Sequence, residues 1–248
     1  MKKFILLASI LICLTACEKD TNSNLSKNDP IIIDARSLEE TKEIEEEKFP
    51  ALKSEIDFND NGIDDYRDFV IGARKDAMNH PKYKSDYISE NNGYPPSDEG
   101  VCTDVIWRAF KEAGYSLREM LNQDIRKRRD AYTNIEDKPD RNIDFRRVKT
   151  LKPFFKEYAE ELEIELNDPN NWQPGDIIFF NPRDYHIGIL SDNRNEEGFP
   201  LVFHNEGQQE REEDILFKKE ISGHFRFNAK NIPEDVLKAW TPGEDGEN

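Results

Sequence analysis

The hydrophobic pattern of this chain changes from helical spacing to strand spacing at about Trp172, and this change constrains the fold more than any other feature. Before it, residues 66–80, 103–114 and 150–163 carry apolar residues at the spacing of amphipathic helices. After it, the turn sequence WQPGD leads into short apolar runs at 177–180, 186–192, 201–207 and 221–228, which are typical of strands. Helices followed by a strand meander predict an α+β domain with N-terminal helices packed on an antiparallel β-sheet.

The first 17 residues, MKKFILLASILICLTAC, have the form of a secretory signal. Two lysines precede an apolar stretch of 11 residues, 4–14, which is too short to span a bilayer. The final LTAC resembles a bacterial lipobox, which implies cleavage before Cys17 and lipidation of that cysteine; an ordinary secretory signal is the alternative. We therefore expect a signal peptide at 1–16 and a lipid-anchored protein on the extracytoplasmic side of the cell envelope. The residue after Cys17 is Glu18 and not the aspartate that usually retains a lipoprotein in the inner membrane. We therefore expect the protein in the outer membrane where a cell has two membranes.

The remaining chain divides into a tether, one domain and a tail. Residues 17–48 are polar and acidic and predict a flexible tether; 49–232 are expected to form the domain and 233–248 a loose C-terminal tail. Removing two lysines with the signal leaves 35 − 2 = 33 basic against 52 acidic residues, a formal charge of −19. This balance argues against nucleic acid as a partner. Membrane attachment is expected through lipid at Cys17.

After processing, Cys102 is expected to be the one free thiol, without a partner for a disulfide, because Cys13 leaves with the signal and Cys17 carries lipid. It precedes Val105, Ile106 and Ala109 by three, four and seven positions, so it shares their helix face in the first turn. Unsatisfied N–H groups and the helix dipole favour a thiolate there and can hold an oxyanion. The sequence predicts an activated nucleophile, with an inert core cysteine as the alternative.

A thiolate nucleophile needs an imidazole to move protons and a polar group to orient that imidazole. Two histidines lie at the ends of strand patterns: His186 opens HIGIL, and His204 ends LVFH. Both are candidates for this chemistry.

Several motifs in order give the chain a recognisable pattern. GVCTDVIWRAFKEAGY, NIDFRRVKTLKPFF, WQPGDIIFF, HIGILSD, FHNEG and GHFRFN resemble domain-of-unknown-function family 1287, which is similar to the NlpC-type papain-like cysteine peptidases of bacterial cell walls. The resemblance covers roughly residues 65–228 and implies a papain-like fold. It departs from the peptidases beside the nucleophile, where Val101, Thr103 and Asp104 replace the usual Asp-Cys-Ser-Gly surroundings.

The resemblance implies roles for individual residues. Cys102 would be the nucleophile and His186 the general base, with His204 as the orienting third residue. Asn205 is the rival for the third role, and strand alternation lets only one of the two face His186. The substrate side of the site is expected to involve three residues near the nucleophile: Tyr94, Thr103 and Asp104. An ordinary packing role for Tyr94 and capping of the helix start by Thr103 and Asp104 are the alternatives.

The resulting hypothesis is a membrane-anchored cysteine peptidase or amidase that cleaves an amide bond, with peptidoglycan stem peptides as the favoured substrate and no cofactor for catalysis. One alternative is a cysteine acyltransferase or thioesterase acting on another cell-envelope substrate. Another is a catalytically silent module that binds wall peptide or a partner protein.

The segment DFNDNGIDDYRD, residues 57–68, has the ligand spacing of a calcium loop. Its oxygen-bearing side chains at loop positions 1, 3, 5, 9 and 12 are Asp57, Asn59, Asn61, Asp65 and Asp68, with Gly62 at the turn. It ends in aspartate where EF-hands place a bidentate glutamate. A structural calcium ion is expected, with a polar turn that caps the following helix as the alternative.

Overall fold

The structure is a computed structural model that describes residues 48–133, 138–181 and 185–247. The expected signal peptide, the lipidated Cys17 and the tether lie outside the described residues. The helices are α2 (Asp65–Asn79), α3 (Cys102–Glu112), α4 (Leu117–Lys127) and α5 (Val148–Tyr158), with short 3₁₀ turns η1 (Asn91–Gly93), η2 (Arg129–Tyr132), η3 (Asp144–Arg146), η4 (Pro169–Asn171) and η5 (Ala229–Asn231). No helix in the described part is long and apolar enough to cross a membrane.

The main sheet has the strand order β3-β8-β4-β5-β6-β7, and every neighbouring pair is antiparallel. Its strands are β3 (Ala159–Glu161), β4 (Ile177–Phe180), β5 (His186–Arg194), β6 (Pro200–Phe203), β7 (Glu212–Glu213) and β8 (Ile221–Phe227). A separate parallel pair joins β1 (Lys82–Tyr83) to β2 (Glu99–Gly100). The expected α+β class, with helices and an antiparallel sheet, is confirmed.

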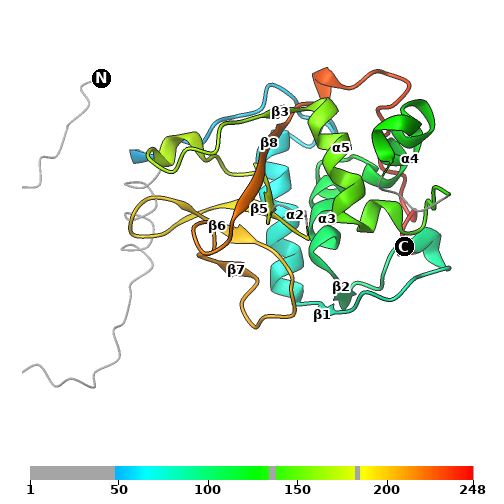
Figure 1. Ribbon diagram of the computed structural model, residues 1–248, viewed down its shortest axis with the longest axis horizontal. Helices are drawn as coiled ribbons and strands as arrows, with labels where there is room; N and C mark the ends of the chain where they lie inside the picture. Colours follow the sequence, from blue (N-terminus) through cyan, green and yellow to red (C-terminus); the bar gives the residue numbers. More distant parts are fainter. Residues whose placement is uncertain (1–47, 134–137, 182–184, 248) are drawn as a thin grey trace, which may run out of the picture. The chain divides into compact units, whose positions relative to one another are not determined.

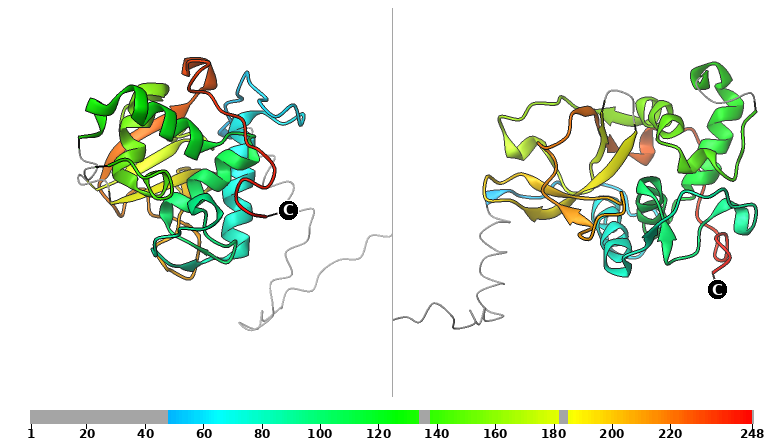
Figure 2. Two further views of the ribbon diagram at one scale, coloured as in Figure 1. Left: turned by 90° about the vertical axis from the view of Figure 1, so that its right-hand side faces the viewer. Right: turned by 60° about the horizontal axis from the view of Figure 1, so that its bottom comes forward.

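The sheet is buried on both faces, and side-chain alternation along β4 explains how. Ile177 and Phe179 join the large core beneath the helices, whereas Ile178 and Phe180 join a smaller core around Trp172. Helices α2, α3 and α5 lie together on one side of the sheet (Figures 1 and 2). Helix α3 packs against β5 and against α2, and a Cβ at Gly72 of α2 would stand 2.7 Å from Ala109 Cα of α3. The close approach of these two helices therefore depends on that glycine.

The turn before β4 is tied to the last strand by a buried carboxylate. Asp176 accepts hydrogen bonds from Arg226 Nε and Nη2, both at 2.7 Å, and lies 2.8 Å from His224 Nε2. The His224 ring stacks on Trp172 with 4.3 Å between ring centroids. These contacts join the WQPGD turn to the GHFRF segment of β8.

The structure corrects two boundaries expected from the sequence. The helix expected at 150–163 ends at Tyr158, because the backbone from Ala159 pairs with Phe227 as strand β3. The tail is packed, not loose: Trp240 N–H donates to Gly114 O at 2.7 Å, and the buried carboxylate of Asp245 forms an ion pair with the partly exposed Lys111. Helix α4 and the short strands β1, β2, β3 and β7 were not expected from the sequence pattern.

Candidate functional site

Cys102 is the first residue of α3, and its sulfur meets the beginning of β5. Hydrogen bonds from the backbone of Ile187 and of Thr103 reach the thiol group. Ile187 directly follows His186, the first residue of β5. The fold therefore brings two residues that are far apart in sequence to one place, because α3 packs along β5.

The thiol lies among apolar side chains and is only 7% exposed. Burial raises the pKa of Cys102 to about 12, and the carboxylates of Asp104 and Glu206 raise it further, while the two backbone hydrogen bonds lower it. The resting thiol is therefore protonated at neutral pH. The expectation of a thiolate at this helix start is corrected, because burial of Cys102 favours the neutral thiol.

The two histidines of the strand half contact each other directly. His186 Nε2 lies 3.1 Å from His204 Nδ1, and the rings are nearly perpendicular at 83°. His186 begins β5 opposite Phe180, and His204 directly follows β6, so the β5–β6 pairing places the rings together. Burial lowers the pKa of both imidazoles to about 3, so both rings are neutral at neutral pH.

Asn205 points away from the histidine pair. Its side-chain amide donates to Gly100 O at 3.2 Å and to Pro81 O at 3.3 Å, and its Oδ1 accepts the Gly207 N–H at 3.0 Å. Gly100 lies two residues before Cys102. Of the two candidates, His204 is therefore the one that faces His186, and Asn205 holds the segment that leads into α3.

Two glutamates that the sequence analysis did not select complete the cluster. Glu206 Oε1 lies 3.4 Å from His186 Nδ1, and Glu206 also pairs with Lys219. Glu213 Oε2 lies 2.9 Å from His204 Nε2. The side chains of both glutamates are partly exposed. The FHNEG motif contains Glu206, but the position of Glu213 depends on the β6–β7 pairing, which had no clear sequence signal.

The described residues contain one group of histidine, cysteine and acidic side chains with the spacing of a metal site. It consists of His186, His204 and Glu206, whose candidate ligand atoms lie within 4.8 Å of one another. Neutral imidazole and carboxylate are ligands that Zn²⁺ accepts. The donor set therefore suits a transition metal, and the same geometry serves proton transfer between the two rings.

The three residues expected on the substrate side are all completely buried. Tyr94 packs against Trp107 and donates its hydroxyl hydrogen bond to Glu244. Thr103 has a buried hydroxyl oxygen without a hydrogen-bond partner among the described residues. None of the three presents a surface to a substrate, which corrects their assignment as substrate-binding residues.

Asp104 has a structural role at the start of α3, beside Cys102. Its carboxylate accepts the Val101 N–H at 2.7 Å, the Trp107 indole N–H at 2.7 Å, and two hydrogen bonds from Arg146 at 2.9 and 3.0 Å. The Val101 contact caps the start of α3. Arg146 therefore forms an internal ion pair with Asp104, and the pair joins η3 to the start of α3.

Three of the five expected calcium ligands, Asp57, Asn59 and Asn61, lie in the loop before α2, and hydrogen bonds join two of them to a fourth, Asp68, in the first turn of that helix. Asp57 accepts hydrogen bonds from the N–H groups of Asn61 at 3.0 Å and Gly62 at 2.7 Å. The side-chain amides of Asn59 and Asn61 donate to Asp68 at 3.3 and 3.0 Å. Burial raises the pKa of Asp68 to about 6. The calcium ion itself stays a prediction.

Asp65 does not lie with the other four expected ligands. Its Oδ1 accepts the Phe58 N–H at 3.0 Å, and its Oδ2 accepts a hydrogen bond from the Tyr115 hydroxyl. Burial raises the pKa of Asp65 above its usual value. As the first residue of α2, Asp65 is turned into the core, which corrects its assignment as a ligand.

The site belongs to an α+β protein in which the buried thiol of Cys102 lies against the start of β5, the strand that begins with His186. Residues 70–227 match the family described as Domain of unknown function (DUF1287), and the chain belongs to that family. The chain is also 33% identical over 165 residues to the uncharacterized protein YijF of Escherichia coli (strain K12), a match that covers 64% of this chain and 80% of that protein. No solved structure matches the chain.

Proposed function

We propose that the protein is a papain-like cysteine hydrolase, related to the NlpC-type peptidases, that cleaves an amide bond. The observation that carries the proposal is the meeting of Cys102 with the start of β5, where His186 contacts His204. Thiol hydrolysis needs a nucleophile, a base beside it and a third group that orients the base. Peptidoglycan stem peptides are the favoured substrate, and lipid at Cys17 would hold the enzyme at the cell envelope.

The contacts of the two rings support one assignment of protons. His204 Nε2–H donates to Glu213, and His204 Nδ1 accepts from His186 Nε2–H. This arrangement leaves His186 Nδ1 with a free lone pair on the side where Glu206 also acts on the Cys102 thiol. In the proposed mechanism, His186 Nδ1 is the nitrogen that receives the thiol proton.

Hydrolysis then follows two acyl-transfer steps. The sulfur attacks the carbonyl carbon as its proton moves to His186, and the imidazolium returns a proton to the departing amine. Water, activated by His186, cleaves the thioester and frees Cys102. The Val101 N–H already donates to Asp104, and the Thr103 N–H donates to the sulfur. The Cys102 N–H is therefore the candidate hydrogen-bond donor to the oxyanion.

Glu206 has opposite effects before and during the reaction. Its charge raises the thiol pKa in the resting protein, yet it lies 3.4 Å from His186 Nδ1 and stabilises the imidazolium that forms. The raised pKa requires thiol deprotonation to accompany attack instead of preceding it.

One observation favours a second candidate function, a catalytically silent binding module. The Cys102 thiol is 7% exposed and burial raises its pKa to about 12, which is typical of an inert cysteine. In that case the histidine pair serves stability or metal binding.

The experiment is mass spectrometry of muropeptides incubated with the purified protein. We expect cleaved stem peptides with the parent chain and none with Cys102→Ala, whereas His80→Asn, which changes an exposed histidine outside the site, should cleave normally. Products joined to an added amine would indicate acyl transfer. Unchanged muropeptides with the parent, or equal digestion by Cys102→Ala, would contradict the hydrolase.

A further inference from the structure

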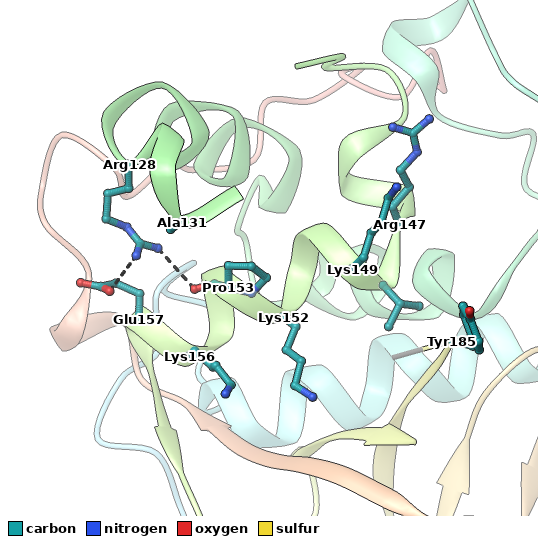
Figure 3. Close-up of a pocket in the computed structure, with 10 residues that line it drawn as sticks. Arg128, Ala131, Arg147, Lys149, Lys152, Pro153, Lys156, Glu157 and Tyr185 are labelled. Atoms are coloured by element: carbon teal, nitrogen blue, oxygen red, sulfur yellow. Dashed lines mark hydrogen bonds and ion pairs between the residues drawn. The ribbon is translucent and has the colours of Figure 1, made fainter. Parts of the chain in front are cut away.

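A basic groove lies along α5 of this acidic protein, outside the cluster of Cys102 and the histidines. It has a volume of about 920 Å³, near the upper end for small-ligand pockets. It extends from Arg128 and Glu157 at one end to Tyr185 at the other (Figure 3). Five of its ten lining residues are basic and one is acidic, whereas the whole chain carries a formal charge of −17.

The spacing of the lysines along α5 places them on one face of the helix. Lys149, Lys152 and Lys156 stand at positions i, i+3 and i+7, so they follow one face of the helix. The opposite face carries the buried residues Leu151 and Phe155. Among the described residues, neither Lys149 nor Lys156 forms an ion pair, so their charges are available to a ligand.

The other two cations are held in place by the protein. Arg128 binds Asp124 and Glu157, and Arg147 lies 3.5 Å from Asp144. A groove with two anchored guanidinium groups and two free ammonium groups attracts carboxylates or phosphates and gives them fixed partners.

Two chain connections join this groove to the thiol site. Tyr185, which is 66% exposed at the end of the groove, directly precedes His186. Arg147 directly follows Arg146, whose buried ion pair with Asp104 fixes the first turn of α3. An extended substrate in the groove would therefore be positioned by segments that also position the reacting groups.

We propose that this groove, lined by Arg128, Arg147, Lys149, Lys152, Lys156 and Tyr185, binds the acidic part of a peptide substrate whose amide bond is cleaved at Cys102. The inference rests on the proposed function for the cleavage step, but the binding step is independent of it. The substrate class is a peptide with several carboxylates near the scissile bond. Positive charge concentrated on one face of an otherwise negative protein gives both attraction and orientation.

The test measures the binding of a fluorescein-labelled hexaglutamate peptide to the Cys102→Ser protein by fluorescence anisotropy, at low and high salt. We expect Lys149→Gln/Lys156→Gln to raise Kd about fivefold or more at low salt, with the difference shrinking at high salt. The matched control Lys53→Gln/Lys218→Gln removes two exposed lysines outside the groove and should change Kd less than about twofold. A hexaglutamine peptide should not bind.

Three results would overturn the inference. The control pair could raise Kd as much as the groove pair does, or hexaglutamine could bind as tightly as hexaglutamate. The protein could also bind phosphatidylglycerol vesicles or inorganic phosphate and not the peptide. Muropeptide cleavage by the Lys149→Gln/Lys156→Gln protein separates the two proposals. Peptide binding without cleavage by the parent rejects the hydrolase and keeps the groove. Cleavage that is insensitive to both lysines rejects the groove and keeps the hydrolase.

Discussion

The side-chain amide of Asn205 lies 3.2 Å from the carbonyl oxygen of Gly100 and so joins the end of β6 to the segment that leads into Cys102. Its neighbour His204 faces the opposite way and contacts His186. Consecutive residues thus have two tasks: Asn205 holds the segment that leads into Cys102, and His204 contacts His186.

This division of tasks predicts that Asn205 contributes to the stability of the fold. Asn205→Ala removes a buried amide and leaves two carbonyl groups without that donor, so we expect a loss of about 1–3 kcal/mol in the free energy of unfolding. Urea denaturation measures it. Asn167→Ala, at an exposed position, is the control and should change stability by less than about 0.5 kcal/mol. A fully stable Asn205→Ala protein would show that these hydrogen bonds do not support the fold.

Glu206 should control the reactivity of the thiol. Its charge raises the Cys102 pKa, so Glu206→Gln is expected to lower that pKa and to speed alkylation by iodoacetamide about threefold to tenfold at neutral pH. The pH dependence of the alkylation rate gives the pKa directly. Glu197→Gln, in an exposed turn, serves as the matched control. No difference between the two variants would mean that the carboxylate does not act on the sulfur.

Glu213 is expected to act as a positioning residue through His204. In the proposed assignment of protons, its Oε2 holds His204 as the Nε2–H tautomer, which leaves the free lone pair on His186 Nδ1. Glu213→Gln should therefore lower kcat about tenfold and shift the pH profile of kcat, with little change in KM or in folding. Glu210→Gln, an exposed acidic neighbour, should behave like the parent. An unchanged pH profile in Glu213→Gln would exclude this role.

The buried histidines should make the protein sensitive to acid. Their folded pKa values, about 3, are below the unfolded value of about 6.5, so the unfolded chain binds more protons between these limits. Their contribution to stability is present above about pH 6.5 and is lost as pH falls toward 3. Urea midpoints across this range should fall less steeply for His204→Gln than for the parent, since one such histidine is absent. Parallel curves would contradict this explanation.

Calcium binding by the 57–68 loop should depend on pH through Asp68. The pKa of Asp68 is raised to about 6, and a metal ion needs the ionised carboxylate, so Ca²⁺ should raise Tm at pH 7.5 and have a much smaller effect at pH 5. Differential scanning calorimetry with Ca²⁺ or a chelator measures the shift. Asp68→Asn should abolish it, while Asp60→Asn, at a non-ligand position, should retain it. A parent protein indifferent to Ca²⁺ at pH 7.5 would leave the loop as a polar turn.

The helical and strand patterns of the sequence carried enough information to predict the α+β class, the helices α2, α3 and α5, and the strands β4, β5, β6 and β8. Local periodicity reports which face of each element is apolar, and these elements have strong apolar faces. The short strands escaped prediction because they are too short to show a period, and their backbone pairing comes from contacts distant in sequence. Helix α4 was missed although Leu117, Met120, Leu121 and Ile125 recur at helical spacing after the N-cap Ser116.

Sequence alone selected Cys102, His186 and His204 as residues with suitable chemistry, because thiols and imidazoles at element ends are few in this chain. Only the tertiary structure decided that His204 and not Asn205 faces His186, that Glu206 and Glu213 complete the cluster, and that the thiol is buried and protonated. Residue identity fixes what a group can do chemically. Its neighbours and its distance from water fix its charge, and both depend on packing between segments that are far apart in the chain.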